Sequence, residues 1–188
     1  MKYPNSNKNF QKEALHNTSR RGMSLESEIN KANQYYLDND LANIHKKPTP
    51  ITIVNVDYPS RNAAKITEAY FKIPSTTDYN GIYKGKYIDF EAKECQSRTA
   101  FPFTSIHPHQ IKHLQSVIKH GAIAFLIMRM THYGQDYLIK ANDFLAFYFS
   151  GLRKSLPYSW IQEHGYPIEF RLLIPCDYLK AVDKAFNL

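Results

Sequence analysis

The longest apolar run of the sequence, residues 122–128, constrains the fold more than any other feature. Seven residues are far fewer than the roughly 20 that a helix needs to cross a bilayer, so the run predicts a strand, which continues to Met130. A strand without polar alternation is typical of a sheet whose two faces are both covered. We therefore expect a buried strand at the centre of a β-sheet.

Helical and strand patterns alternate along the chain, which indicates an α/β fold. An apolar stripe of Leu25, Ile29, Ala32 and Tyr36 predicts a first helix that begins near Gly22. The other predicted elements are a strand over 51–58, a tight turn at Lys84 and Gly85 before a strand over 87–93, a helix opened by 107–110 and ended by Gly121, short strands over 137–139 and 171–174, an aromatic segment over 144–149 capped by Asn142 or Asp143, and a last helix capped by Asp177.

The charge of the chain is strongly positive. It has 24 basic and 17 acidic residues, a formal net charge of +7 and a pI near 9.3. The first 120 residues carry 17 basic and 11 acidic residues, so most of the excess lies there. A pI above about 9 is typical of a nucleic-acid partner, and the 14 tyrosines and 11 phenylalanines include candidates for stacking on unpaired bases.

The sequence predicts a cytoplasmic protein without a membrane anchor. The first residues lack the apolar segment of a secretory signal. Cys95 and Cys176 are too few for a disulfide framework, so we expect reduced thiols. Residues 1–19 are polar and predict a mobile N-terminal arm before a single domain over 20–188.

Asp78 and the triplet Glu91-x-Lys93 are the candidate catalytic residues. Period-2 alternation in the strand over 87–93 places Asp89, Glu91 and Lys93 on one face, and a short hairpin can bring Asp78 beside Glu91. Two converging carboxylates need a cation between them, or one of them must take up a proton. Oxygen ligands of this kind suit Mg²⁺, with Mn²⁺ as a substitute, and a nearby ammonium group can hold water and offset charge on a reacting phosphate.

Two other interpretations of this part of the chain are open. The short motif is common, so Asp89, Glu91 and Lys93 could instead form a solvated strand face. The spacing of His107, His109 and His113 could suggest zinc, but no cysteine or fourth ligand accompanies them, which favours contact with DNA phosphates or a place on a helix surface.

Longer segments of the sequence resemble the RecU family of Holliday-junction resolvases, which belongs to the PD-(D/E)xK nuclease superfamily. The resemblance spans roughly residues 20–188. It departs from the superfamily motif at Thr77, which stands where proline would precede Asp78. The matching segments are RRGMSLE at 20–26, HKKPTPI at 45–51, NVDYP at 55–59, STTDYNGIYKGKYIDFEAKE at 75–94, FPF and IHPHQ within 101–110, and PCDYLKAVDK at 175–184.

This resemblance implies a restriction-endonuclease-like core, with a mixed central sheet flanked by helices and a protruding stalk at about 48–74. It implies Mg²⁺ bound by Asp78 and Glu91 with Thr76 and Gln110, a catalytic Lys93, and Glu26 as an additional acid. The candidate DNA-binding residues, which include the basic and aromatic residues of the stalk, are Arg20, Arg21, Arg61, Lys65, Tyr70, Phe71 and Lys72.

The implied function is hydrolysis of phosphodiesters in four-way DNA junctions by a homodimer that nicks opposed strands during recombination and repair. A recombinase or a branch-migration motor is a further partner that the resemblance suggests. Two alternatives remain at this stage: another endonuclease of the superfamily that acts on duplex DNA, or a junction-binding protein without catalytic activity that modulates recombination.

Overall fold

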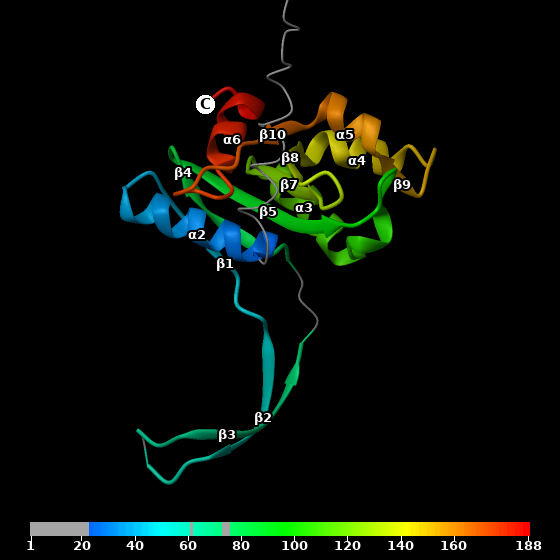
Figure 1. Ribbon diagram of the computed structural model, residues 1–188. Coiled ribbons are helices and arrows are strands. Elements are labelled where there is room, and N and C mark those ends of the chain that lie inside the picture. The colour runs from blue at the N-terminus through cyan, green and yellow to red at the C-terminus, as the bar shows by residue number, and fades with distance from the viewer. Residues whose placement is uncertain (1–22, 61, 73–75) are drawn as a thin grey trace, which may run out of the picture.

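The computed structural model describes residues 23–60, 62–72 and 76–188, in which helices lie on both sides of a β-sheet (Figure 1). The elements in chain order are α2 (Leu25–Asp38), β1 (Ala42–Lys46), β2 (Ile51–Asp57), β3 (Lys65–Phe71), β4 (Tyr79–Tyr83), β5 (Lys86–Cys95), β6 (Ala100–Pro102), η1 (Phe103–Ser105), α3 (Pro108–Lys119), β7 (Ile123–Met130), β8 (Gln135–Lys140), α4 (Ala141–Phe149), β9 (Ser155–Pro157), α5 (Tyr158–His164), β10 (Tyr166–Ile168) and α6 (Tyr178–Phe186).

Six strands form the central sheet in the order β1-β4-β5-β7-β8-β10. The pair β5 and β7 is parallel, and the other pairs are antiparallel, so the sheet is mixed, as predicted. All eight residues of β7 are buried, which confirms the expectation drawn from the apolar run. This α/β architecture places β5 between β4, which pairs with residues 86–90, and β7, which pairs with residues 88–95.

Two apolar clusters fill the space on the two faces of the sheet. One contains Phe90 and Phe125 with residues of α2 and α6. The other contains Leu126 and Met128 with residues of α3, α4 and α5. Successive residues of β7 thus point into different clusters, because side chains alternate across a strand.

The hairpin between β4 and β5 fixes the strand that carries the candidate triplet. Lys84 and Gly85 form its turn with φ values of 47° and 71°, as a two-residue turn matched to the twist of the strands requires. Gly81 in β4 approaches β1 so closely that an added Cβ would lie 2.1 Å from the Asn43 carbonyl oxygen. The hairpin is therefore held tightly by its neighbour.

The strands β2 and β3 form a separate two-stranded ribbon that projects away from the central sheet (Figure 1). Every residue of both strands is exposed. The Lys72 backbone N–H donates to the Pro50 carbonyl oxygen at 3.0 Å, so the two ends of the ribbon lie side by side. The predicted strand over 51–58 therefore belongs to the ribbon and not to the central sheet.

Three predictions about local structure are wrong. Residues 171–174 form no strand, and the late strand is β10 instead. The helix α4 follows β8 directly, with Lys140 as its N-cap instead of Asn142 or Asp143. The first helix begins at Leu25 and not near Gly22, because Ser24 is its N-cap and accepts a hydrogen bond from the Ser27 N–H at 3.2 Å.

Both cysteines are buried thiols. Cys95 ends β5, and Cys176 precedes α6. Within the described ranges, no helix has the length and hydropathy needed to span a membrane. The predicted arm over 1–19 lies outside the described residues.

Candidate active site

Asp78 and Glu91 meet because of the register between β4 and β5. Tyr79 pairs with Phe90, so Asp78, which immediately precedes β4, lies next to Glu91. The Asp78 backbone N–H donates to Glu91 Oε2 at 3.2 Å. The hairpin therefore brings together the two carboxylates that the sequence places thirteen residues apart.

Lys93 joins the same group from the next position on that face of β5. Its Nζ lies 2.6 Å from Glu91 Oε1 and 4.0 Å from Asp78 Oδ2. The Glu91 side chain is fully buried, whereas Asp78 and Lys93 are 37% and 25% exposed. Two acids and one ammonium group thus converge where Asp78 and Lys93 reach solvent.

Glu91 is held in surroundings that disfavour its charge. Burial is the largest cause and raises the pKa of its carboxyl to about 8, with a further increase from Asp78 that outweighs the ion pair with Lys93. Glu91 Oε1 is buried and accepts no hydrogen bond of good geometry within the described part of the chain, although Lys93 Nζ is close. A cation beside Asp78 would favour the charged form of both carboxyls.

The donor set fits a hard divalent cation, with two carboxylates contributed by the protein. Water fills the other positions of a Mg²⁺ ion in many proteins, because this ion keeps part of its hydration shell. Across residues 23–60, 62–72 and 76–188, no group of three or more His, Cys, Asp or Glu side chains is placed to hold a metal. Hydroxyl, amide and water oxygens are ligand types that can complete the coordination of such an ion.

Thr76 and Gln110 are the two predicted ligands of that kind. Thr76 precedes β4, and its hydroxyl donates to the Thr77 carbonyl oxygen at 3.2 Å. Gln110 is buried in the first turn of α3, where its Oε1 accepts from the His107 N–H at 2.9 Å. Both side chains therefore have partners within their own segments.

Glu26 lies across a pocket from Asp78. The pocket has a volume of about 230 Å³ and is lined by both residues together with Tyr79 and Glu94. Glu26 also pairs with Lys46, whose Nζ lies 2.6 Å from Glu26 Oε1. The structure thus brings the predicted additional acid to the cavity that Asp78 borders.

The predicted DNA-binding residues lie mainly on the ribbon. Lys65, Tyr70 and Phe71 are exposed on β3, and Lys72 follows that strand. Phe71 is 84% exposed, which is unusual for a large apolar side chain. Arg20, Arg21 and Arg61 lie outside the described residues.

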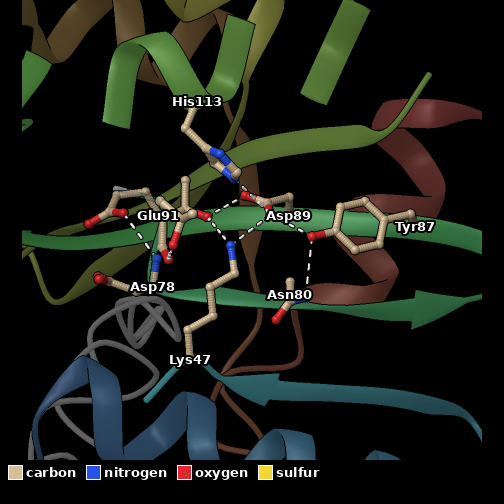
Figure 2. A network of polar contacts seen from close by, with 9 residues as sticks. Lys47, Asp78, Asn80, Tyr87, Asp89, Glu91 and His113 are labelled. Carbon is tan, nitrogen blue, oxygen red and sulfur yellow. Dashed lines mark hydrogen bonds and ion pairs between the residues drawn. The ribbon is translucent and has the colours of Figure 1, made fainter. Parts of the chain in front are cut away.

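Asp89 is a functional candidate that the sequence alone does not single out; it shares the polar face of its strand with Glu91 and Lys93, for which a solvated face was the alternative interpretation. The structure buries it completely on β5, two residues before Glu91. Figure 2 shows the side chains that converge on it. Lys47 Nζ lies 2.8 Å from Asp89 Oδ2, the Tyr87 hydroxyl donates to the same oxygen at 2.9 Å, and Thr77 Oγ1 donates to Oδ1.

His113 reaches the same carboxylate from α3, with its Nε2 3.1 Å from Asp89 Oδ2. Burial by itself raises the pKa of Asp89, but the hydrogen bonds from Lys47, Thr77 and His113 together lower it below its usual value. Asp89 therefore stays ionised. Its position on the alternating strand was visible in the sequence, whereas its partners come from segments that only the fold brings together.

The comparison with protein families agrees with the geometry. A family model described as "Recombination protein U" (RecU) matches residues 20–184. "Holliday junction resolvase RecU" of Oceanobacillus iheyensis is 51% identical over 195 residues, which cover 99% of this chain and 100% of that protein. The protein of the same name from Bacillus mycoides is 47% identical over 99% of this chain and 98% of its own length.

Among solved structures, the Holliday junction resolvase Hjc of Archaeoglobus fulgidus matches 66% of this chain and 81% of its own, with a TM-score of 0.36 and 8% identity. The sequence comparisons are much closer, with about half of all positions identical over nearly the whole chain. They confirm the resemblance drawn from the sequence motifs. The chain belongs to the RecU family.

Proposed function

We propose that this protein is a Holliday-junction resolvase, a divalent-metal-dependent endonuclease that acts as a cytoplasmic homodimer and nicks opposed strands of four-way DNA junctions. The observation that carries the proposal is the convergence of three groups: Lys93 Nζ lies within 4.0 Å of a carboxylate oxygen of both Asp78 and Glu91, and the Asp78 backbone N–H donates to Glu91. The names of the close relatives support the same substrate.

Asp78 and Glu91 would hold the metal, with Thr76 and Gln110 as additional oxygen donors. A bound Mg²⁺ ion supplies Lewis-acid stabilisation of the phosphoryl oxygen and lowers the pKa of water. The raised pKa of Glu91 supports this assignment, because a carboxyl that is buried beside another acid gains its charged form when a cation is near. Mn²⁺ has similar ligand preferences and would substitute for it.

Lys93 would position the attacking water and offset charge that develops on the phosphate. Its ammonium group is within 4.0 Å of both carboxylates, and its side chain is a quarter exposed, so Lys93 can face a DNA strand without losing its acidic partners. Fixed positive charge at the reacting phosphate is worth most when the protein holds it in place beforehand.

The ribbon would supply preference for branched DNA. A four-way junction differs from duplex DNA in shape and in the accessibility of its central bases, and aromatic side chains can stack on bases that lack neighbours. Tyr70 and Phe71 stand 61% and 84% exposed on β3, and Lys65 and Lys72 offer positive charge beside them. Phosphate contacts of this kind give affinity without reading sequence.

The test compares a synthetic four-way junction with a linear duplex of matched sequence, each incubated with the full-length protein with and without Mg²⁺. We expect symmetric nicking of the junction only when Mg²⁺ is present. Asp78→Asn and Glu91→Gln should bind the junction, but each should lower the cleavage rate by a factor of about 100 or more. A single-turnover assay on denaturing gels measures the rates.

Two outcomes would select the alternatives. Equal cleavage of junction and duplex would identify an endonuclease of duplex DNA. Tight junction binding without any metal-dependent nicking would identify a non-catalytic junction-binding protein. Comparable cleavage by Asp78→Asn and the wild type would refute the two-carboxylate site.

A further inference from the structure

Asp89 is a buried carboxylate that the proposed chemistry does not use. It shares a strand and a face with Glu91 but points toward Lys47 and His113 (Figure 2). Its two oxygens receive hydrogen bonds from several segments of the chain. A buried charge with such partners costs stability unless all of them stay in place, so the arrangement indicates a specific role.

Two partners of Asp89, Lys47 and Thr77, come from the two chain segments that enter and leave the ribbon. Lys47 follows β1 and leads toward β2, and Thr77 lies between β3 and β4. Lys47 Nζ also donates to Thr77 Oγ1 at 3.0 Å, which closes a triangle of polar contacts. The Lys47 side chain is 18% exposed, so it is largely withdrawn from solvent.

The same two segments hold the backbone of Asp78. The Lys47 backbone N–H donates to the Asp78 carbonyl oxygen at 2.8 Å, and the Asp78 N–H donates to Glu91 Oε2. Thr77, whose hydroxyl is anchored on Asp89, is the residue before Asp78. The position of the Asp78 carboxylate thus depends on Lys47, which binds the Asp78 carbonyl oxygen, and on Thr77, which precedes Asp78 and is held by Asp89.

We infer that Asp89, Lys47 and Thr77 form a clamp that positions Asp78 beside Glu91 and fixes the base of the β2–β3 ribbon against the active site. Asp89, Lys47 and Thr77 are positioning residues in this arrangement, and the inference rests on the proposed function for its effect on cleavage. Displacement of a reacting group by about 1 Å can reduce a rate about 100-fold, so loss of the clamp should slow cleavage more than it weakens binding.

The experiment uses the full-length protein with three variants that keep side-chain shape: Lys47→Met, Asp89→Asn and Thr77→Val. Junction affinity is measured in Ca²⁺, and single-turnover cleavage is measured in Mg²⁺. Lys47→Met and Asp89→Asn should each lower the cleavage rate by a factor of about 10 or more, whereas junction affinity should change by less than about threefold. Thr77→Val should show a smaller loss of rate, since it removes one hydroxyl.

The matched control is Lys84→Met. Lys84 Nζ lies 2.8 Å from Asp183 Oδ1, the same separation as in the pair of Lys47 with Asp89, but on an exposed surface far along the hairpin. This variant should cleave and bind like the wild type. Thermal unfolding of each protein separates a local effect on the site from global loss of the fold.

The double variant Lys47→Met with Asp89→Asn distinguishes a clamp from a DNA contact. Members of one network give losses that do not add, so the double variant should cleave about as slowly as Lys47→Met alone. If the losses in rate multiply instead, Lys47 and Asp89 act independently of each other. If junction affinity falls as much as the rate, Lys47 contacts DNA directly. Either result would overturn the clamp.

A nuclear magnetic resonance measurement tests the clamp without cleavage. The amide resonance of Asp78 should shift in Lys47→Met and in Asp89→Asn and stay unchanged in Lys84→Met. An unchanged Asp78 amide in both clamp variants would overturn the inference. Cleavage by Asp78→Asn at the wild-type rate would instead refute the proposed function, and the amide shift would still decide whether Lys47 and Asp89 position that residue.

Discussion

At the scale of single residues, Glu91 shows how burial controls the protonation of this site. Its pKa of about 8 lies above the value of about 4.3 expected in the unfolded chain. Between these values the folded protein binds a proton that the unfolded chain releases. The free energy of unfolding contributed by Glu91 is therefore greatest below about pH 4 and falls as the pH rises to about 8.

This sign predicts the behaviour of Glu91→Gln without metal. Glutamine cannot ionise, so the variant should gain thermal stability over the wild type as the pH rises from 6 to 9. Because a difference of one pKa unit corresponds to about 1.4 kcal/mol, the gain should reach several degrees in Tm. Calorimetry in the presence of a chelator measures it, and a gain that is constant with pH would contradict the raised pKa.

Arg129 is the other residue with a large predicted effect, and it acts on stability. It is buried on β7 and forms two hydrogen bonds of 2.7 Å with Asp136, a contact with Glu28 of α2, and a longer contact of 3.7 Å with Glu94. Burial disfavours its charge, but the hydrogen bonds to Asp136 and Glu28 raise the pKa of Arg129 above its usual value. The guanidinium group thus joins α2 to two neighbouring strands.

We expect Arg129→Met to destabilise the protein by about 3–5 kcal/mol, because removal of one partner leaves buried carboxylates uncompensated. Urea unfolding in the absence of metal measures the change. The exposed pair of Lys84 and Asp183 provides the control, since Lys84→Met should cost less than about 1 kcal/mol. If both variants lowered the free energy of unfolding equally, burial of the Arg129 cluster would add nothing to the stability of the protein.

At the scale of elements, the ribbon can be removed without disturbing the central sheet. Its ends adjoin at Pro50 and Lys72, so a bridge of a few glycines in place of residues 51–71 should close the chain without strain. We expect the shortened protein to fold and to bind duplex DNA but to lose its preference for junctions. Competition binding between junction and duplex measures this, and an unchanged preference would mean that the central domain recognises the branch.

The sequence predicts the elements whose periodicity matches their burial. The apolar stripe of α2 and the apolar run of β7 predict these two elements correctly, because both face the apolar clusters. The alternation of β5 predicts the strand, but not the burial of Asp89 and Glu91 on its polar face. Residues 171–174 were misread as a strand because their apolar character indicated burial, yet Leu172 and Leu173 are exposed. Strand β10 was missed because it contains Pro167, which a sheet tolerates at an edge.

The sequence predicts the part of the candidate site that the hairpin of β4 and β5 brings together. Asp78, Glu91 and Lys93 lie on neighbouring strands joined by a short turn, so local pairing suffices to bring them together. The contacts of Asp89 with Lys47 and His113 span 42 and 24 positions in sequence. They depend on the pairing of β1 with β4 within the sheet and on the packing of α3 against the sheet, which no local pattern specifies.

At the scale of the whole molecule, the exposure of the ribbon bears on the oligomeric state that we propose. A two-stranded ribbon is at best marginally stable in water, and here both strands are exposed along their whole length. We expect the protein to sediment as a dimer of its 21.9 kDa chain, and the shortened protein to dissociate more readily. Analytical ultracentrifugation of both proteins measures this, and a wild type that stays monomeric at micromolar concentration would contradict the proposed homodimer.

The positive charge of the whole chain should govern affinity. With a net charge of +7 per chain, binding should release counterions from DNA, so junction affinity should fall at least about tenfold between about 50 and 200 mM salt. Fluorescence anisotropy across this range gives the slope. A flat response would show that the basic residues do not contact phosphates.

The burial of both cysteines gives the molecule a practical property. Ser60, at the far end of the ribbon, is exposed, and Ser60→Cys would place a single reactive sulfur there while the two native ones remain shielded. A fluorophore attached at that point would follow the ribbon tip in single-molecule experiments, with the unmodified protein as a dark background.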